Sequence, residues 1–353
     1  MAGGIGTRFW PMSRRANPKQ LLNIVDSKSM LRLTYERVRQ LTTSDKILII
    51  TNQEQVGPIK KQLKGIPKEN IIAEPMGRNT APCIGLACAI IKARGGADET
   101  MVVLPSDHLI SDAIKFRSTI KIAVEFVQKR DCLLTIGIKP KYPETGYGYI
   151  QMKDEVLGGK NTEIFKVKTF AEKPNLETAA LFLKSGDFLW NCGIFIWSVK
   201  KIINEIDEYL PELAEDLIKI EKAYNTPHFS ASIRDVYSRT RSISIDYGVM
   251  ERAKDVYVIR ADFDWNDLGS WEAVYNISPK DKLGNVIQSK DNVLLNSKDN
   301  YFHVQKKLIV AVDVEGLVVV DMDDAILICK KDSSQKIKSV VEVLERNEQE
   351  SYL

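Results

Sequence analysis

Histidine and cysteine are scarce in this chain: there are three histidines and five cysteines among 353 residues. The cysteines are scattered, form no Cys-Xaa-Xaa-Cys pair and are odd in number, which argues against a disulfide framework. So few histidines also argue against a zinc site built from histidine and cysteine. We expect the cysteines to be buried thiols in a reducing compartment.

Long apolar runs and an excess of one charge are absent too. Apolar stretches such as 308–312 are far too short to span a bilayer, and the N-terminus lacks the basic and apolar regions of a signal peptide. The chain has 50 basic and 47 acidic residues, a net charge of +3, so its overall charge favours neither nucleic acid nor membrane as a partner. We therefore predict a cytoplasmic protein that binds anions through local groups.

The first 140 residues show apolar, β-branched runs that alternate with helical patterns. The predicted strands are 46–51, 70–74, 100–104 and 133–138, and the predicted helices are 29–41, 53–63, 80–94 and 114–129. This alternation predicts crossover connections and an α/β domain with a mixed, mostly parallel sheet. Ligands of such sheets bind beyond the carboxyl ends of the strands, so the residues directly after each strand are informative.

The length of the chain predicts two domains, because one core rarely grows this large. Up to residue 278 the pattern continues with strands at 147–152, 163–170, 192–198 and 256–261 and helices at 199–224 and 247–254. Beyond Pro279, short strands recur at 293–295, 301–304, 308–312, 317–320 and 325–329. They predict a small barrel or β-helix-like domain that ends in an amphipathic helix over 334–347. The predicted domains are 1–278 and 279–353.

A glycine-rich segment lies at the very start of the chain. Gly3, Gly4 and Gly6 allow backbone N–H groups to point into one concavity, which suits phosphate oxygens, and Arg8 adds a planar fork of donors. It is not a P-loop, since no Gly-Lys-Ser/Thr follows. Nor is it a dinucleotide fingerprint, because Pro11 interrupts any helix directly after it.

Lys19, held behind a proline close to this loop, can add a second positive charge, although a lone lysine is more often solvated. Asp107 follows a predicted buried strand, where a carboxylate is a natural Mg²⁺ ligand, although an isolated aspartate is more often a cap. Glu172 and Lys173 end another strand and form either a sugar-phosphate site or a surface ion pair. Cys192 has no nearby base and is rejected as a nucleophile.

These features combine into a specific resemblance. The segment Gly3–Ser13 followed by Pro18–Gln20 resembles the signature of the sugar-1-phosphate nucleotidyltransferases. Seven further blocks match in order: Glu74–Pro82, Leu104–His108, Pro143–Ile150, Phe170–Pro174, Trp190–Phe195, Ser244–Gly248 and Phe263–Trp271. Within the family they are most similar to the guanylyltransferases that use mannose 1-phosphate. The resemblance implies a Rossmann-like catalytic domain followed by a small β-helical domain.

The resemblance also implies roles for individual residues. Arg8 and Lys19 would be catalytic, and Asp107 and Asp267 would hold Mg²⁺, with Asp264 as a nearby alternative to Asp267. The implied nucleotide-binding residues are Ala2, Gly3, Gly4, Gly6, Thr7, Glu74, Arg78, Asn79, Thr80 and Pro82. The implied sugar-phosphate-binding residues are Gly146, Glu172, Lys173 and Asn191.

Several of these implied roles have structural alternatives. Asn79 or Thr80 can cap the helix over 80–94, and Pro82 suits its first turn. Glu74 or a backbone carbonyl can accept from guanine, and Arg78 or a backbone N–H can donate to it. The tryptophans of these blocks can flank a pocket or lie in the core: Trp190, Trp265 and Trp271.

The implied reaction is an in-line displacement, in which a phosphate oxygen of mannose 1-phosphate attacks the α-phosphorus of GTP and pyrophosphate leaves. A different sugar 1-phosphate or nucleotide, and a non-catalytic nucleotide-sugar sensor, are the alternatives. No isomerase activity is expected, and a homodimer is an open alternative to a monomer. We also expect an apolar strand ahead of such a glycine loop. The residues before Gly3 do not supply one, so the sheet would lack a central strand.

Overall fold

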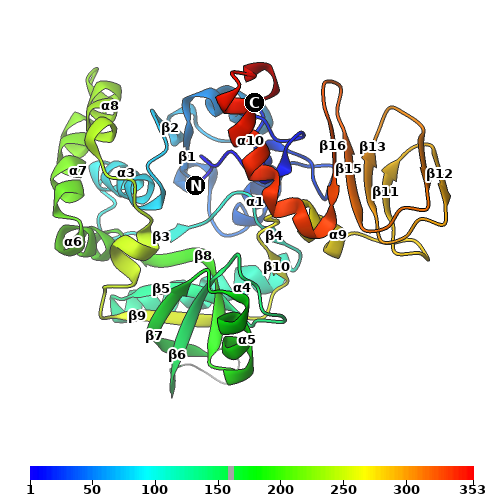
Figure 1. Cartoon of the computed structure of the whole chain (residues 1–353). Coiled ribbons are helices and arrows are strands. Elements are labelled where there is room, and N and C mark those ends of the chain that lie inside the picture. The colour runs from blue at the N-terminus through cyan, green and yellow to red at the C-terminus, as the bar shows by residue number, and fades with distance from the viewer. Residues whose placement is uncertain (158–162) are drawn as a thin grey trace.

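Six strands form the main sheet of this computed structural model, which describes residues 1–157 and 163–353. Their order across the sheet is β3-β8-β5-β9-β7-β6 (Figure 1). Their bounds are Thr100–Val103 (β3), Leu133–Ile138 (β5), Gly148–Val156 (β6), Ile164–Glu172 (β7), Phe188–Ser198 (β8) and Val256–Ala261 (β9).

The sheet is mixed, as predicted, but its neighbouring strands are seldom parallel. β5 and β9 are parallel, whereas β8 is antiparallel to both β3 and β5, and β7 is antiparallel to both β9 and β6. Strands β3, β5, β9 and β6 therefore run in one direction, and β8 and β7 return between them. Four of the six strands run in the same direction, as expected for a mostly parallel sheet. The prediction that neighbouring strands are mostly parallel is wrong, because β8 lies between β3 and β5 and runs in the opposite direction.

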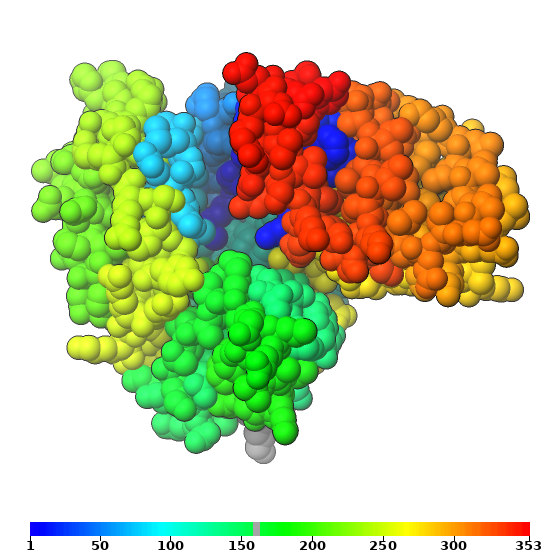
Figure 2. All heavy atoms as spheres, viewed as in Figure 1, coloured from blue at the N-terminus to red at the C-terminus, as the bar shows by residue number. Residues whose placement is uncertain are grey.

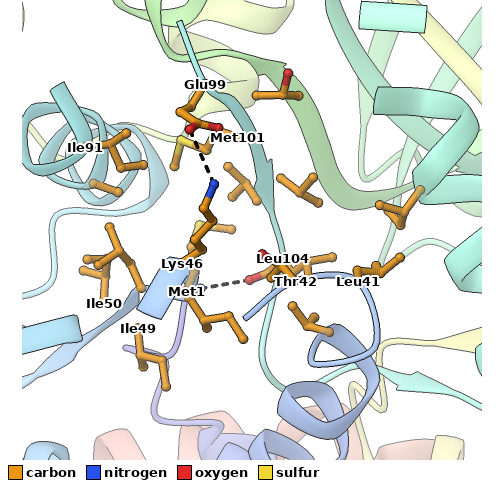
Figure 3. A pocket seen from close by; sticks show the side chains of 18 of the residues that line it. Met1, Leu41, Thr42, Lys46, Ile49, Ile50, Ile91, Glu99, Met101 and Leu104 are labelled. Carbon is orange, nitrogen blue, oxygen red and sulfur yellow. Dashed lines mark hydrogen bonds and ion pairs between the residues drawn. The ribbon is translucent and has the colours of Figure 1, made fainter. Parts of the chain in front are cut away.

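Two further strands, β1 (Ile49–Asn52) and β2 (Ile71–Glu74), pair in parallel and form a separate sheet. The first two residues connect it to β3: Ala2 donates its N–H to Ile50, and the Met1 ammonium donates to the carbonyl of Leu104 at 2.8 Å. Above them lies a cavity of about 840 Å³, which we call the β1–β3 slot. Figure 3 shows Met1, Ile50 and Met101 around it, with Lys46 and Glu99 paired across its mouth.

The helices cover the sheets on both sides. Their bounds are Met30–Val38 (α1), Val56–Gln62 (α2), Thr80–Ala93 (α3), Ala113–Arg130 (α4), Leu176–Ser185 (α5), Val199–Tyr209 (α6), Pro211–Ala223 (α7), Phe229–Arg239 (α8), Trp271–Ile277 (α9) and Ile337–Arg346 (α10). Helix α3 is apolar on nearly all sides, so it is buried against α6 and α7, whereas α4 packs on β8 and β9. Among the described residues, no helix is both long and apolar enough to cross a membrane.

The second domain is a β-helix. Its strands are Val286–Ser289 (β11), Asn292–Leu295 (β12), Tyr301–Val304 (β13), Ile309–Val312 (β14), Leu317–Asp321 (β15) and Ile326–Lys330 (β16). β11, β13 and β15 stack in parallel on one face, β12 and β14 stack on another, and β16 closes the first face in antiparallel fashion. Of the two predicted forms, barrel and β-helix-like coil, the coil is confirmed. Asn300 donates to Asn285 at 3.0 Å, which links successive turns of the coil.

The two domains meet at the start of the chain. Phe9 packs on Trp271 with ring centroids 5.0 Å apart, and Trp271 packs in turn on Tyr301 of β13. The indole of Trp10 donates to the carbonyl of Tyr352 at 2.8 Å. Figure 1 shows α10, in red, beside the blue N-terminal segment, with the coil next to both. The glycine loop is therefore supported from behind by the β-helix and the terminal helix.

Candidate active site

A hollow opens between the N-terminal segment, the green part of the main sheet and the yellow-green segment that precedes β9 (Figure 2). Blue N-terminal atoms lie on its floor. The carboxyl ends of β1, β2 and β3 lead into the segments that supply its polar groups, as expected for an α/β sheet.

The glycine loop leaves its backbone donors free. Within the described residues, the N–H groups of Gly3, Gly4 and Gly6 donate to no acceptor. Gly6 has φ +69°, and a Cβ there would lie 2.4 Å from the Cβ of Lys19, so only glycine fits this position without strain. The exposed side chain of Arg8 follows and forms no ion pair with the described residues. The loop thus offers a set of unused N–H groups beside an unpaired guanidinium.

Gln20 and Thr51 hold this loop in shape. The Gln20 amide donates to the carbonyls of Ala2 at 2.7 Å and Gly4 at 2.9 Å, and Thr51 donates to Ala2 at 2.9 Å. Both polar side chains are buried. Because the loop carbonyls are occupied on the inner side, the loop N–H groups remain for the cleft.

Lys19 lies at the centre of the site and is only 5% exposed. Its ammonium donates to Asp107 Oδ2 at 3.0 Å and also to the backbone carbonyl of Asp267. Three candidates that are far apart in the sequence therefore meet at one point. Burial has the largest single effect and would raise the pKa of Asp107, but the charges of Lys19 and His108 and the hydrogen bond from Lys19 together hold that pKa below its ordinary value.

Asp267 is fixed by two donors that reach the same oxygen. Tyr147 donates its hydroxyl to Asp267 Oδ1 at 2.8 Å, and the Gly269 N–H donates at 2.9 Å. Burial, reinforced by the charge of Asp267, raises the pKa of Tyr147, so the phenol stays protonated. Asp264, the alternative candidate, is exposed and instead pairs with Lys141 at 3.5 Å. The geometry favours Asp267.

The carboxylates have room for a cation. Asp267 Oδ2 and Asp107 Oδ1 accept no hydrogen bond from the described residues. No group of three or more His, Cys, Asp or Glu side chains suited to a metal occurs in 1–157 and 163–353. Mg²⁺, however, is commonly held by one or two carboxylates, with substrate phosphates and water completing its shell. This donor set therefore fits Mg²⁺ on a bound nucleotide.

The sugar-side candidates form a second cluster directly beyond Tyr147. Gly148 in β6 lies opposite both Glu172 and Asn191, and a Cβ on Gly148 would come within 2.7 Å of Glu172 Oε2. Lys173 pairs with Glu172. Gly146 is exposed and donates to Glu144 Oε1 at 2.8 Å. The structure thus brings Glu172, Lys173 and Asn191 together, with Gly146 on the adjoining loop.

Asp246 is a site residue that sequence reasoning missed. It begins a short π-helix, Asp246–Met250, and accepts from Asn191 Nδ2 at 2.8 Å. Asn191 Oδ1 accepts from the Gly193 N–H at 3.1 Å, so the orientation of its amide is defined on both sides. Burial, together with the charge of Glu172, raises the pKa of Asp246. Asp246 lies in the Ser244–Gly248 block, which resembles the family pattern. The sequence does not show, however, that its carboxylate bonds to Asn191.

The segment between β2 and α3 combines structural and exposed groups. Glu74 is 6% exposed and accepts from Tyr237 at 2.9 Å, and its Oε2 lies 3.2 Å from where a Cβ of Gly3 would be. Arg78 donates to the carbonyls of Tyr237 and Ser238. Asn79 is exposed, has φ +68° and caps α3 through Thr80 N.

The remaining candidates of this segment face the protein. Thr80 Oγ1 accepts from Ile245 N at 2.8 Å, and Pro82 is buried within α3. Of the three tryptophans, Trp190 and Trp271 are core residues, whereas Trp265 donates to His108 Nδ1 at 3.2 Å beside Asp107.

Comparison with protein families gives two matches in the expected order. Residues 1–283 match the family described as nucleotidyl transferase, and residues 290–344 match one described as the MannoseP isomerase/GMP-like beta-helix domain.

Individual proteins give the same picture. A mannose-1-phosphate guanylyltransferase of Escherichia coli is 39% identical over all of this chain and 74% of its own length. One of Klebsiella pneumoniae is also 39% identical, with the same coverage. A solved structure from Thermus thermophilus, titled mannose-1-phosphate geranyltransferase, superimposes with a TM-score of 0.85 at 30% identity and covers 98% of both chains.

Proposed function

Because this chain belongs to the nucleotidyltransferase family, and within it to the mannose-1-phosphate guanylyltransferases, we propose that it transfers GMP from GTP to α-D-mannose 1-phosphate. A phosphate oxygen of the sugar forms a bond to the α-phosphorus. The bond from that phosphorus to the bridging oxygen of the β-phosphate breaks, and the products are GDP-mannose and pyrophosphate. The observation that carries this proposal is the meeting of Lys19, Asp107 and Asp267 beside the glycine loop.

The triphosphate binds on the glycine loop. The free N–H groups of Gly3, Gly4 and Gly6 suit phosphate oxygens, and Arg8 adds an unpaired positive charge. Lys19 stabilises the charge that builds up on the departing pyrophosphate. Glu74, whose carboxylate lies close to Gly3, and the exposed Asn79 contact the base and ribose.

Mannose 1-phosphate binds on the second cluster. Lys173 holds its phosphate, whereas Glu172 and the second N–H of Asn191 contact its hydroxyls. Because Asp246 and Gly193 fix the Asn191 amide, that N–H is presented in one orientation.

The nucleophile is already an anion, so no side chain has to remove a proton. The residues act by positioning the two substrates in line and by neutralising charge. Asp107 and Asp267 would hold Mg²⁺, which when bound neutralises the α-phosphate. Tyr147 keeps Asp267 in place through its hydroxyl.

The metal assignment is tested by three alanine variants. Asp107→Ala and Asp267→Ala should each lower kcat by about 10²–10³-fold, the usual loss when a main source of transition-state charge stabilisation is removed. Asp264→Ala is the matched control, because this exposed aspartate lies on the same loop but pairs with Lys141. Its kcat should stay within twofold of the parent.

Tm and Mg²⁺ titrations complete this experiment. The Asp107 variant should keep its fold, since its carboxylate is still partly exposed, at 34% for the side chain. Near-normal turnover of both variants at saturating Mg²⁺ would refute the metal assignment while leaving the reaction itself open.

A further inference from the structure

Arg37 in helix α1 is a buried cation without an acceptor. It is 8% exposed, and in the described part of the chain its guanidinium forms neither an ion pair nor a hydrogen bond. It packs on the ring of Phe116, whose centroid lies 5.5 Å from Arg37 Cζ. A ring can stabilise the flat face of a guanidinium, but it cannot accept from the N–H groups around its edge.

A buried guanidinium without an acceptor destabilises the folded protein unless a bound anion pairs with it. Burial lowers the pKa of Arg37 to about 10, so the group still carries its charge at neutral pH. Buried charges in proteins are normally paired, because desolvation is otherwise uncompensated.

Arg37 lines a cavity of about 810 Å³, which we call the Arg37 pocket. The pocket lies where α1, α4 and the strand β4 (Leu109–Ile110) approach the beginning of the β-helix. Its volume is that of a small-molecule site. Its polar lining also includes Arg117, Ser111 and Gln288.

Hydrogen-bond donors are in excess in this pocket. Arg117 forms no ion pair with the described residues, and the Gln288 amide oxygen already accepts from His303 Nδ1 at 2.7 Å, which leaves its NH₂ group. Of the two acidic residues of the lining, Glu36 pairs with Lys28 at 2.6 Å and with Arg32 at 3.1 Å. Asp26 accepts from the Lys28 N–H at 3.0 Å through one carboxylate oxygen.

We propose that the Arg37 pocket is a second ligand site, distinct from the catalytic cleft, which binds a small phosphate-bearing anion. The phosphate pairs with Arg37 and Arg117, and the rest of an organic phosphate packs on apolar wall residues such as Leu33 and Ile277.

The pocket is joined to the active site by one short element. β4 directly follows Asp107 and His108 and pairs with β10 (Trp265–Asn266), which directly precedes Asp267. A ligand on one side of β4 therefore contacts the strand pair that carries both proposed metal ligands. Occupancy of the pocket should be measurable at the active site as a change in kcat.

Thermal unfolding tests the proposal, with inorganic phosphate and a hexose 6-phosphate as probes at constant ionic strength. The triple variant Arg8→Met/Lys19→Met/Lys173→Met serves as background, because it removes the three positive charges proposed to bind phosphate in the catalytic cleft. Each probe that binds the pocket should still raise its Tm by about 2–5 °C at saturation. A rise with phosphate alone identifies inorganic phosphate as the ligand, and a larger rise with the ester identifies an organic phosphate.

Adding Arg37→Met to this background should abolish the rise, whereas the matched control Arg39→Met, an exposed position on the same helical turn, should retain it. Without probe, Arg37→Met should unfold at the same temperature as its parent or higher, because no hydrogen bond or ion pair is lost and the methionine can still pack on Phe116. If Arg37→Met does not fold, Arg117→Gln should weaken probe binding about tenfold. An undiminished rise in Arg37→Met, or no rise with either probe in the background variant, would overturn the proposal.

Discussion

Lys19 shows how much of the site depends on one side chain. It is almost fully buried, and its ammonium contacts both Asp107 and the carbonyl of Asp267. Removing it would raise the pKa of Asp107, because the charge of Lys19 is the largest of the effects that lower it. Its sequence neighbour Gln20 supports the glycine loop from below. The short Pro-Lys-Gln segment thus supplies a positive charge to the site and an amide that holds the glycine loop in place.

Glu74 gives a pH-dependent prediction. Burial raises its pKa from 4.5 to about 7, against the hydrogen bond from Tyr237. A carboxyl whose pKa is raised on folding favours the folded state fully below its unfolded pKa, and this contribution is lost as the pH rises through the folded value. Relative to the parent, Glu74→Gln should therefore gain up to about 3 kcal/mol of unfolding free energy between about pH 4.5 and 7.

Urea unfolding across this pH range measures the difference. The matched control is Glu69→Gln, which changes an exposed glutamate a few residues away and should show no such trend. A flat difference for Glu74→Gln would mean that this carboxyl is not buried as the structure has it.

Candidate site residues were predictable where their type and neighbours specify the chemistry. Arg8 and Lys19 follow a glycine loop, and Asp107 follows an apolar strand, so the sequence alone indicates their position in an α/β fold. The prediction that this strand is buried holds only for Val103. Tyr147 and Asp246 were not predictable, because a phenol or a carboxylate becomes a site residue only through its partners. Those partners, Asp267 and Asn191, are remote in the sequence.

At the scale of elements, the conformation of the glycine loop depends on Gly6, whose backbone is left-handed. Gly6→Ala would place a methyl group 2.4 Å from Lys19 Cβ at φ +69°. It should lower stability by about 1–3 kcal/mol and displace Lys19, with a fall in kcat. Gly4→Ala is the control for stability, since nothing lies within 4 Å of its added Cβ.

Urea denaturation of both variants decides the point. Equal stability of the Gly6 and Gly4 variants would show that the loop is not held in this conformation.

The β1–β3 slot gives a second prediction at this scale. Ala2 and Met1 already bond to Ile50 and Leu104 as the end of a strand between β1 and β3 would, and the slot above them is lined by apolar side chains. Five β-branched apolar residues fused ahead of Met1 should continue that strand. Burial of these side chains should raise Tm by about 3–6 °C, and the better-anchored glycine loop should raise activity.

Differential scanning calorimetry of this fusion needs a glycine-serine extension of equal length as its control. Identical Tm values and activities for the two extensions would contradict the idea that the slot accepts a strand.

Most elements were predictable because their apolar period is clear. The strand 133–138 and the helix over 80–94 appear nearly as expected, as β5 and α3. The pairing of β8 was not predictable, since an apolar run carries no information about strand direction. The two-residue strands β4 and β10 are too short to have a period, although they connect the proposed metal ligands.

At the scale of the whole molecule, the β-helix packs against the N-terminal segment and so supports the candidate active site. One apolar cluster joins Phe9 and Trp10 to Trp271, Tyr301 and Ile337. Arg15 adds ion pairs to Glu345 and Glu350. Phe9 lies three residues after Gly6, so its packing on the second domain limits how far the glycine loop can move. The sequence predicted the second domain but not this contact, because packing between remote segments has no local pattern.

The whole molecule is proposed to join GMP to mannose 1-phosphate, and this reaction can be measured directly. The most direct measurement is pyrophosphate release with Mg²⁺ across a matrix of nucleoside triphosphates and sugar 1-phosphates. We predict the highest kcat/KM for GTP with mannose 1-phosphate, with release that requires both substrates and yields GDP-mannose. No release with that pair, or clearly faster release with another nucleotide or sugar phosphate, would contradict the account.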